Sequence, residues 1–274
     1  MEIDPPQQPS PEDRLADALL ALEPTRRQRI LRKFIMAALG AVPWVGSLLN
    51  AAQAYKEEAS QMKTDALQQQ WLEEHKFKLQ ELSKALSETM QRFDGLGDEI
   101  QDRIESEEYL AIVRKAFRIW DQADTEQKRE YVRRLIANAG ATLAAPDDLV
   151  RLFLDWLNTY HEAHFAVIRE IYKNPGITRA KIWEIIHGQF PREDSSEADL
   201  FKLLIADLSF GHVIRQHRET NTDGQFVRKT SSGRRSPSGT MKSAFDDEEP
   251  YVLTELGKKF VHYVFTDIVQ KIEG

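Results

Sequence analysis

Two histidines that lie three residues apart are the most direct candidate for chemistry in this chain. His161 and His164 share one face of a predicted helix, and this spacing can hold a metal ion. A metal site needs further ligands, however, and Glu162 does not complete the zinc-binding His-Glu-x-x-His pattern. We therefore interpret the two side chains as a capped, partly buried histidine pair, and we expect no metal site.

Three carboxylates form the second candidate cluster. Asp121, Asp124 and Glu126 fall at a predicted junction between helices, where capping residues are expected. Asp124 and Gln127 have the spacing of a capping box, which favours a structural role. The sequence has no glycine-rich phosphate loop, nucleophile elbow or kinase motif set, and its lack of cysteine excludes thiolate catalysis. We expect no catalytic residue and no cofactor, and hence a protein that is not an enzyme.

The overall composition indicates a folded protein with an acidic balance of charge. The chain has 274 residues, of which 41% are hydrophobic, and its formal net charge is −7. This charge disfavours a protein whose whole surface binds nucleic acid. Residues 1–13 are acidic and proline-rich, without the basic-then-apolar order of a secretory signal. We therefore expect a disordered tail on a cytoplasmic protein.

Residues 34–55 stand out because none of them is charged. As one helix they would measure about 33 Å, enough to cross a hydrocarbon core of about 30 Å. Pro43 near the middle and the polar Asn50 and Gln53 oppose a permanent span. We instead predict two short helices joined over residues 42–46. Such a hairpin can serve as protein core, or can enter a membrane after a trigger.

The residues of this apolar hairpin and of its basic flank are the candidate membrane contacts. The hairpin residues are Phe34, Ile35, Gly40, Val42, Pro43, Trp44, Val45, Gly46, Leu48 and Leu49. The flank suits anionic lipid, and its five basic residues are Arg26, Arg27, Arg29, Arg32 and Lys33.

A helical pattern over residues 53–93 predicts one long helix, with Leu79, Leu82 and Leu86 on its apolar stripe. Such a helix cannot bury its stripe alone, so it must fold against other helices or pair with a second copy as a coiled coil. We therefore predict a helical bundle over residues 14–145. The expected partner is a protein, a second copy of this chain included.

Residues 146–274 change character and predict a separate domain with a small β wing. Three helical segments are expected, the first continuous to Tyr172 and the others capped by Thr178 and Ser196. The strand-like segments HVIRQHR and YVLT then flank a flexible polar loop at 220–248, and a final helix follows.

The end of the chain resembles the aromatic-x-Leu-Thr-x-x-Gly-x-x-Phe close of winged-helix domains. The matching residues are Tyr251, Leu253, Thr254, Gly257 and Phe260. The resemblance implies a winged helix-turn-helix, so the expected fold class is mainly α, with an N-terminal bundle and a C-terminal winged-helix domain. A resemblance in fold says little about function.

DNA binding is one function that a winged helix implies, with its second helix in the major groove. The residues that we expect to be exposed on the predicted second helix are Glu193, Asp194, Glu197, Asp199 and Asp207, against the single cation Lys202. Phosphates repel carboxylates. The loop is better suited to phosphate contact, since it carries the five cations Arg228, Lys229, Arg234, Arg235 and Lys242. We favour a protein-interaction or dimerisation role and keep a DNA-binding transcriptional regulator as the alternative.

The N-terminal half resembles bacterial cell-suicide and pore-forming helical proteins, and abortive-infection proteins of the alpha type in particular. The resemblance rests on the segment GAVPWVGSLLNA, on the long helix after it and on the closing Tyr-x-Leu-Thr. It implies a hairpin that long helices shelter and that reaches membrane lipid on activation, as an anti-phage defence. Three interpretations stay open: a soluble interaction protein, a conditional membrane effector and a DNA-binding regulator.

Overall fold

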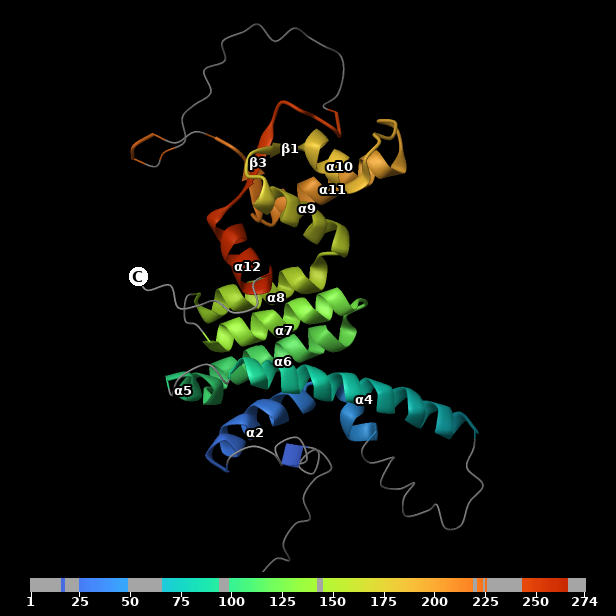
Figure 1. The fold of residues 1–274 in the computed structure, drawn as a ribbon, viewed down its shortest axis with the longest axis vertical. Coiled ribbons are helices and arrows are strands. Elements are labelled where there is room, and N and C mark those ends of the chain that lie inside the picture. The colour runs from blue at the N-terminus through green and yellow to red at the C-terminus, as the bar shows by residue number, and fades with distance from the viewer. Residues whose placement is uncertain are drawn as a thin grey trace, which may run out of the picture. The chain divides into compact units, whose positions relative to one another are not determined.

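The computed structural model describes residues 16–17, 25–48, 66–93, 99–141, 145–218, 221–223, 225 and 243–265. The chain is mainly helical, with one three-stranded antiparallel sheet (Figure 1). It divides into two compact units. Unit 1 comprises Met1–Asn158 with Tyr263–Gly274, and unit 2 comprises Thr159–His262.

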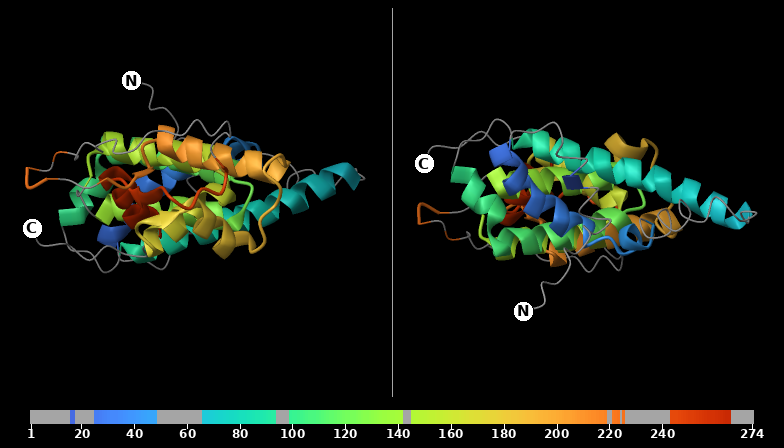
Figure 2. Two further views of the ribbon diagram at one scale, coloured as in Figure 1. Left: turned by 90° about the horizontal axis from the view of Figure 1, so that it is seen from above. Right: turned by 90° about the horizontal axis from the view of Figure 1, so that it is seen from below.

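Unit 1 is helical throughout its described elements. Their bounds are α2 (Thr25–Leu39), a short helix over residues 43–48, α4 (Ala66–Arg92), α5 (Glu99–Glu105), α6 (Glu107–Gln122), α7 (Glu126–Ala141) and α8 (Asp147–Thr159). Figures 1 and 2 show α4, α6 and α7 side by side, with α2 against α6 and α5. This arrangement buries one face of each helix, as an amphipathic bundle requires.

The boundary between the units falls after Asn158, whereas the sequence placed it after residue 145. The reason is that α8 packs with unit 1. Lys128 donates from Nζ to the Asn158 carbonyl oxygen at 3.3 Å, and Lys115 forms a 2.6 Å ion pair with Asp155. The buried face of α8 therefore completes the N-terminal bundle instead of opening the C-terminal domain.

Phe34 of α2 lies at the centre of the unit 1 core. Its ring centroid is 5.7 Å from that of Phe93, edge to face, and 6.1 Å from that of Phe117. Full burial of a side chain of this size stabilises a fold by roughly 1.5–3 kcal/mol. Packing is closest at Gly140, where a Cβ atom would lie 2.8 Å from both the Phe93 ring and the Tyr109 hydroxyl. Only glycine fits there without a shift of these rings.

The turn of the apolar hairpin lies earlier than predicted. α2 ends at Leu39, the turn covers residues 40–42, and Pro43 opens the short helix that follows. We predicted the joint over residues 42–46 because we treated the proline as a helix breaker. At the first position of a helix its missing N–H breaks no hydrogen bond, so the proline starts the second helix instead.

Of the long helix predicted over residues 53–93, the structure describes α4, and residues 53–65 lie outside the described part of the chain. The first turns of α4 extend past the helices against which it packs (Figure 2). Phe77 of α4 is 64% exposed.

The capping residue of α7 also differs from the prediction. The hydroxyl of Thr125 accepts a 3.3 Å hydrogen bond from the backbone N–H of Lys128, which makes Thr125 the cap. Asp124, the predicted cap, lies one residue earlier and is exposed. Both residue types favour this position, so the sequence pattern does not separate them by one residue.

Unit 2 alternates helices with a small sheet. Its elements are α9 (Glu162–Lys173), β1 (Ile177–Thr178), α10 (Arg179–His187), α11 (Ser196–Phe210), β2 (Ile214–Gln216), β3 (Pro250–Leu253) and α12 (Glu255–Phe265), whose last residues belong to unit 1. The sheet has the order β1-β3-β2, and β3 pairs antiparallel with both neighbours. The sequence predicted β2 and β3 but not the two-residue β1.

The helix predicted to continue to Tyr172 is broken at Tyr160. α8 ends at Thr159, and His161 has extended backbone angles (φ −89°, ψ 168°) before α9 begins. The His161 backbone N–H donates to Nδ1 of His164 at 3.1 Å. The continuous apolar pattern hid this break, because the histidine that starts the new helix is not a common capping residue.

The next two helices begin close to where they were predicted. The Thr178 hydroxyl accepts from the Lys181 N–H at 3.4 Å, as expected for a cap of α10. Ser195, one residue before the predicted Ser196, caps α11 by accepting from the Ala198 N–H at 3.2 Å. Serine suits either position, so the pattern fixed the turn but not the residue.

Residues 243–248, the last part of the loop predicted to be flexible, are held by contacts within unit 2. Glu193 accepts a 2.9 Å hydrogen bond from the Ala244 N–H. The Phe245 ring packs against Trp183 at 5.1 Å and Phe201 at 6.0 Å. A loop of polar composition therefore returns to the core through one aromatic residue.

Candidate protein-interaction surface

The apolar hairpin of the sequence analysis lies in the core of unit 1. Its large apolar residues are almost fully buried, and these are Phe34, Ile35, Val42, Val45 and Leu48. Gly40 and Pro43 are exposed, Trp44 and Gly46 are half-buried, and Leu49 lies outside the described residues. Among the described residues, the structure contains no helix that is both long and apolar enough to cross a membrane.

Polar contacts hold the hairpin at both ends. The Trp44 indole N–H donates a 2.7 Å hydrogen bond to the Asp121 carboxylate, and the Trp44 ring lies 5.8 Å from that of His75. At the other end Lys33 forms a 2.6 Å ion pair with Glu105. Arg32 pairs with Asp17. The structure places Arg26, Arg27 and Arg29 in α2 but does not describe their side chains.

The carboxylates considered as a cluster serve separate structural roles. Asp121 accepts from Trp44, and Glu126 pairs with Arg133 at 2.8 Å. Asp124 is exposed in the turn between α6 and α7. The structure therefore does not bring these carboxylates together as a reactive group.

A cluster around Glu130 was not anticipated from the sequence. Its carboxylate accepts hydrogen bonds of 2.8 Å from Arg92 of α4 and from Arg133 and Arg134 of α7. Burial opposes ionisation of Glu130, but these three hydrogen bonds outweigh it and lower its pKa to about 2. The helical spacing of Glu130 with Arg133 and Arg134 was visible in the sequence, whereas the contact with Arg92 depends on the fold. The cluster joins two helices of the bundle.

The histidine pair lies at the start of α9 and next to α11. His164 is buried, its Nε2 lies 3.4 Å from the Asp207 carboxylate, and its ring stacks on that of Tyr160 at 5.0 Å. Burial lowers the pKa of His164, although hydrogen bonding to Asp207 opposes this effect. Among the described residues no group of histidines and carboxylates is suited to hold a metal ion.

α11 has apolar residues on two faces. Its buried face packs into unit 2 through Ala198, Phe201, Leu204, Ile205 and Leu208. Leu200, Leu203 and Phe210, spaced by three and seven residues, share another face. They are 52%, 54% and 86% exposed. We call these three residues the α11 stripe. Side chains of this size are costly to leave in water, and such clusters typically mark contact surfaces.

The charges around the α11 stripe are mainly acidic. Glu197 and Asp199 lie in the first turn of α11, and Asp207 lies between Leu203 and Phe210. The one cation of the helix, Lys202, lies 3.8 Å from Glu193 and 3.9 Å from Asp199. This face therefore presents apolar and acidic groups together.

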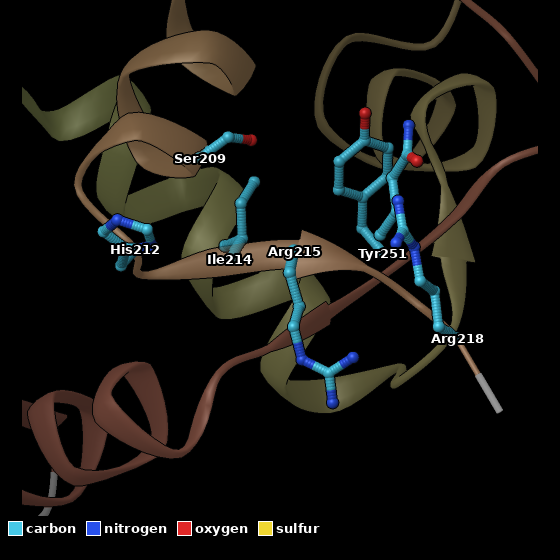
Figure 3. A pocket seen from close by; sticks show the side chains of 7 residues that line it. Ser209, His212, Ile214, Arg215, Arg218 and Tyr251 are labelled. Atoms are coloured by element: carbon cyan, nitrogen blue, oxygen red, sulfur yellow. The ribbon is translucent and has the colours of Figure 1, made fainter. Parts of the chain in front are cut away.

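A cavity of about 370 Å³ opens beside β2. Its lining residues are Ser209, His212, Ile214, Arg215, Gln216, Arg218 and Tyr251 (Figure 3). The tight turn after α11 places His212 in the left-handed region (φ 56°), and the Thr254 hydroxyl donates to its carbonyl oxygen at 2.6 Å. This contact holds a backbone conformation that residues with a side chain adopt only at a cost.

The cations predicted for phosphate contact, Arg228, Lys229, Arg234, Arg235 and Lys242, lie outside the described residues. The α11 stripe was not predicted either. Its signal in the sequence was a helix that is apolar on more than one side, a pattern that is also typical of complete burial. No known protein family, curated protein sequence or solved structure matches this chain.

Proposed function

We propose that this chain is a non-enzymatic, cytoplasmic interaction protein whose unit 2 binds a protein partner through the α11 stripe. The observation that carries this proposal is the exposure of Leu200, Leu203 and Phe210 on one face of a well-packed helix. Large apolar side chains that lie exposed together on one face typically mark a protein contact surface. The acidic residues around the stripe favour a partner whose apolar surface has a basic edge.

The arrangement of unit 2 supports a winged helix-turn-helix, with α10 and α11 as the turn pair and β2 and β3 flanking the wing. The closing motif has a structural explanation in this fold. The Thr254 hydroxyl accepts from the Gly257 N–H at 2.9 Å and so caps α12. A Cβ atom on Gly257 would lie 2.1 Å from the Val213 carbonyl oxygen, and Phe260 is fully buried. The motif thus supports a fold and leaves function to the surface of α11.

In a winged helix, α11 would be the helix offered to DNA. Its exposed face offers leucine, phenylalanine and carboxylates, whereas base edges and phosphates are bound by Arg, Lys, Asn and Gln. This composition favours a protein partner over DNA. The test is binding of a DNA duplex at low salt. If Lys202→Glu weakens this binding and Leu203→Asp does not, the result would favour a DNA-binding regulator instead.

Site-specific photo-crosslinking tests the α11 proposal in cells. A benzophenone amino acid at Phe210 replaces one exposed aromatic side chain with another, and the same group at Glu107 in unit 1 is the control. We expect a crosslinked product from position 210 that Leu203→Asp removes, since Leu203 is exposed and its change leaves the core intact. Mass spectrometry then distinguishes a second copy from another protein. Equal products from both positions, or none from position 210, would refute the proposal.

The apolar hairpin supports a second proposal, conditional membrane activity as part of an anti-phage abortive infection response. The supporting observation is that its apolar residues are sheltered in unit 1, while polar contacts such as Trp44 with Asp121 close it. Release of these contacts would expose a continuous apolar surface, which is the property that a triggered membrane effector needs.

Charges at exposed hairpin positions test this second proposal without disturbing the core. Pro43 and Ser47 are both exposed, so Pro43→Asp and Ser47→Asp should leave stability nearly unchanged while opposing lipid insertion. We expect both variants to lose toxicity on expression and dye release from anionic vesicles. The matched control is an Asp at Thr159, an exposed position at the end of α8. Activity that all three variants retain would exclude hairpin insertion.

A further inference from the structure

β2 (Ile214–Gln216) is an outer strand, because the strand order is β1-β3-β2. One of its edges is bonded to β3. The His217 N–H donates to the Pro250 carbonyl oxygen at 2.8 Å, and the Thr254 N–H donates to that of Val213 at 3.0 Å. In an antiparallel pair the bonded residues alternate along the strand. The Val213 carbonyl group, the backbone groups of Arg215 and the His217 N–H therefore face β3.

The backbone groups of Ile214 and Gln216 consequently point away from β3. The register agrees, since Arg215 lies opposite Val252 and is flanked by these two residues. Apart from the pairing within the sheet, no backbone hydrogen bond in the described ranges reaches the N–H or C=O groups of Ile214 or Gln216. An open edge of this kind is a template for a further strand.

The cavity of about 370 Å³ adjoins this open edge and gives an added strand room for side chains. Figure 3 shows Ser209, Ile214 and Tyr251 directed to one side of β2 and Arg215 directed to the other. Side chains of an added strand would alternate between these two sides. One set would meet an apolar and hydroxyl-bearing surface, and the other set would meet the Arg215 guanidinium.

The charge at this edge selects the class of strand. Arg215 and Arg218 both line the cavity, and Arg218 is exposed, with no ion pair to any residue in the described ranges. Glu255 lies near enough to Arg215 to interact with its charge, and Glu249 bonds the Gln216 side chain, so Arg218 is the cation most open to a new anion. The chain's own segment 226–242 carries four arginines and lysines before Lys242, and these like charges disfavour it as the occupant.

We propose that the outer edge of β2 binds an extended acidic peptide segment of a partner protein, which adds to the sheet as a fourth strand. The backbone groups of Ile214 and Gln216 would bond the peptide main chain, and Arg218 would pair with the carboxylates on one side of the peptide. Strand addition of this kind derives affinity from main-chain bonds and specificity from alternate side chains. The surface differs in residues and in partner charge from the α11 stripe, so neither proposal depends on the other.

Nuclear magnetic resonance of the ¹⁵N-labelled full chain tests the proposal with a defined probe. The probe is an acetylated and amidated hexapeptide of alternating Glu and Thr. Its two controls are the Lys-Thr peptide of the same pattern and a Glu-Thr peptide whose alternate backbone nitrogens are methylated. We expect the Glu-Thr peptide to shift the Ile214 and Gln216 amides and to slow their hydrogen exchange, while the amides of Arg215 and His217 stay paired as before.

Two protein variants separate charge from main-chain pairing. Arg218→Glu should weaken binding of the Glu-Thr peptide by about tenfold, because it reverses the charge of an interface residue. Arg151→Glu on α8 should leave the affinity for this peptide unchanged. Gln216→Pro removes an N–H that points away from β3 and should abolish the shift at Ile214 with the fold retained. Equal binding of the Glu-Thr and Lys-Thr peptides, full binding of the methylated peptide, or no shift by the Glu-Thr peptide at millimolar concentration would overturn the proposal.

Discussion

Glu130 offers the most quantitative test of how unit 1 is held together. Three arginines on two helices donate to its carboxylate, and its side chain is only 23% exposed. Burial raises the pKa of Glu130, but the arginines lower it by more. The net effect is a decrease of the pKa of Glu130 from 4.5 to about 2. A decrease of about 2.5 units corresponds to about 3.4 kcal/mol at 1.36 kcal/mol per unit. Solvent screening at a partly exposed site reduces this, so we expect about 2 kcal/mol.

The sign of the pH dependence follows from the lowered pKa. The ionised Glu130 stabilises the folded state fully above its unfolded value of 4.5, and this stability is lost as the pH falls toward about 2. Glu130→Gln removes the charge at every pH. The variant should therefore be less stable than the wild type by about 2 kcal/mol at neutral pH, and the difference should vanish near pH 2.

Urea unfolding followed by tryptophan fluorescence measures this difference. Four of the five tryptophans, at positions 44, 71, 120 and 156, belong to unit 1, so the signal reports mainly on the unit that contains Glu130. Glu107→Gln is the matched control, because Glu107 pairs with Arg114 but is 75% exposed. It should change stability by less than about 0.5 kcal/mol. A difference for Glu130→Gln that stays constant from neutral pH to pH 3, or that does not exceed the control, would refute the reasoning.

Three further predictions concern single contacts. Gly211→Ala should destabilise unit 2 by about 1–3 kcal/mol in thermal unfolding, because a Cβ atom there would lie 2.0 Å from the Tyr160 hydroxyl. Adding Tyr160→Phe to the same chain should recover part of this loss of stability. Trp44→Phe should lower the stability of unit 1 by about 1 kcal/mol, since it removes the hydrogen bond to Asp121. In a chain that already carries Asp121→Asn, the same change should lower the stability by less. His164 should make unit 2 less stable as the pH falls below its unfolded value of 6.5, because burial lowers its folded pKa and the unfolded chain takes up the proton first. His164→Gln should flatten this dependence in hydrogen exchange of the buried unit 2 amides, and an unchanged slope would contradict it.

Much of the fold could be predicted from local patterns. Helical periodicity located the elements of the bundle, and Thr178 and the Tyr-x-Leu-Thr segment located the start of α10 and the strand β3. These features depend on residues close in sequence. The break at Tyr160 was missed because His161, which precedes the new helix, is not a common capping residue. The two-residue strand β1 was missed because it depends on a contact with a distant segment. Ile177 of β1, for example, pairs with Tyr251, more than seventy residues away.

The position of Pro43 illustrates a different kind of error. The sequence alone shows a proline within an apolar stretch, and the rule that proline breaks helices placed the hairpin joint around it. The same residue favours the first turn of a helix, and the structure uses it there, after a turn at residues 40–42. The type of residue was informative, but two rules competed, and the packing of Ala41 and Val42 into the core decided between them.

The α11 stripe could not be predicted for a reason that also supports its role. A helix that is apolar on several sides is expected to be surrounded by protein, and in α11 one face meets the rest of unit 2 while Leu200, Leu203 and Phe210 remain exposed. Within a single chain, sequence pattern cannot distinguish burial against the chain itself from burial against a partner, because both require the same apolar side chains. The apolar pattern of α11 predicts burial, but three of its large apolar side chains are exposed. This difference between expected and observed exposure is therefore the feature that points to a partner. It is largest at Phe210, which is why the crosslinker belongs at that position.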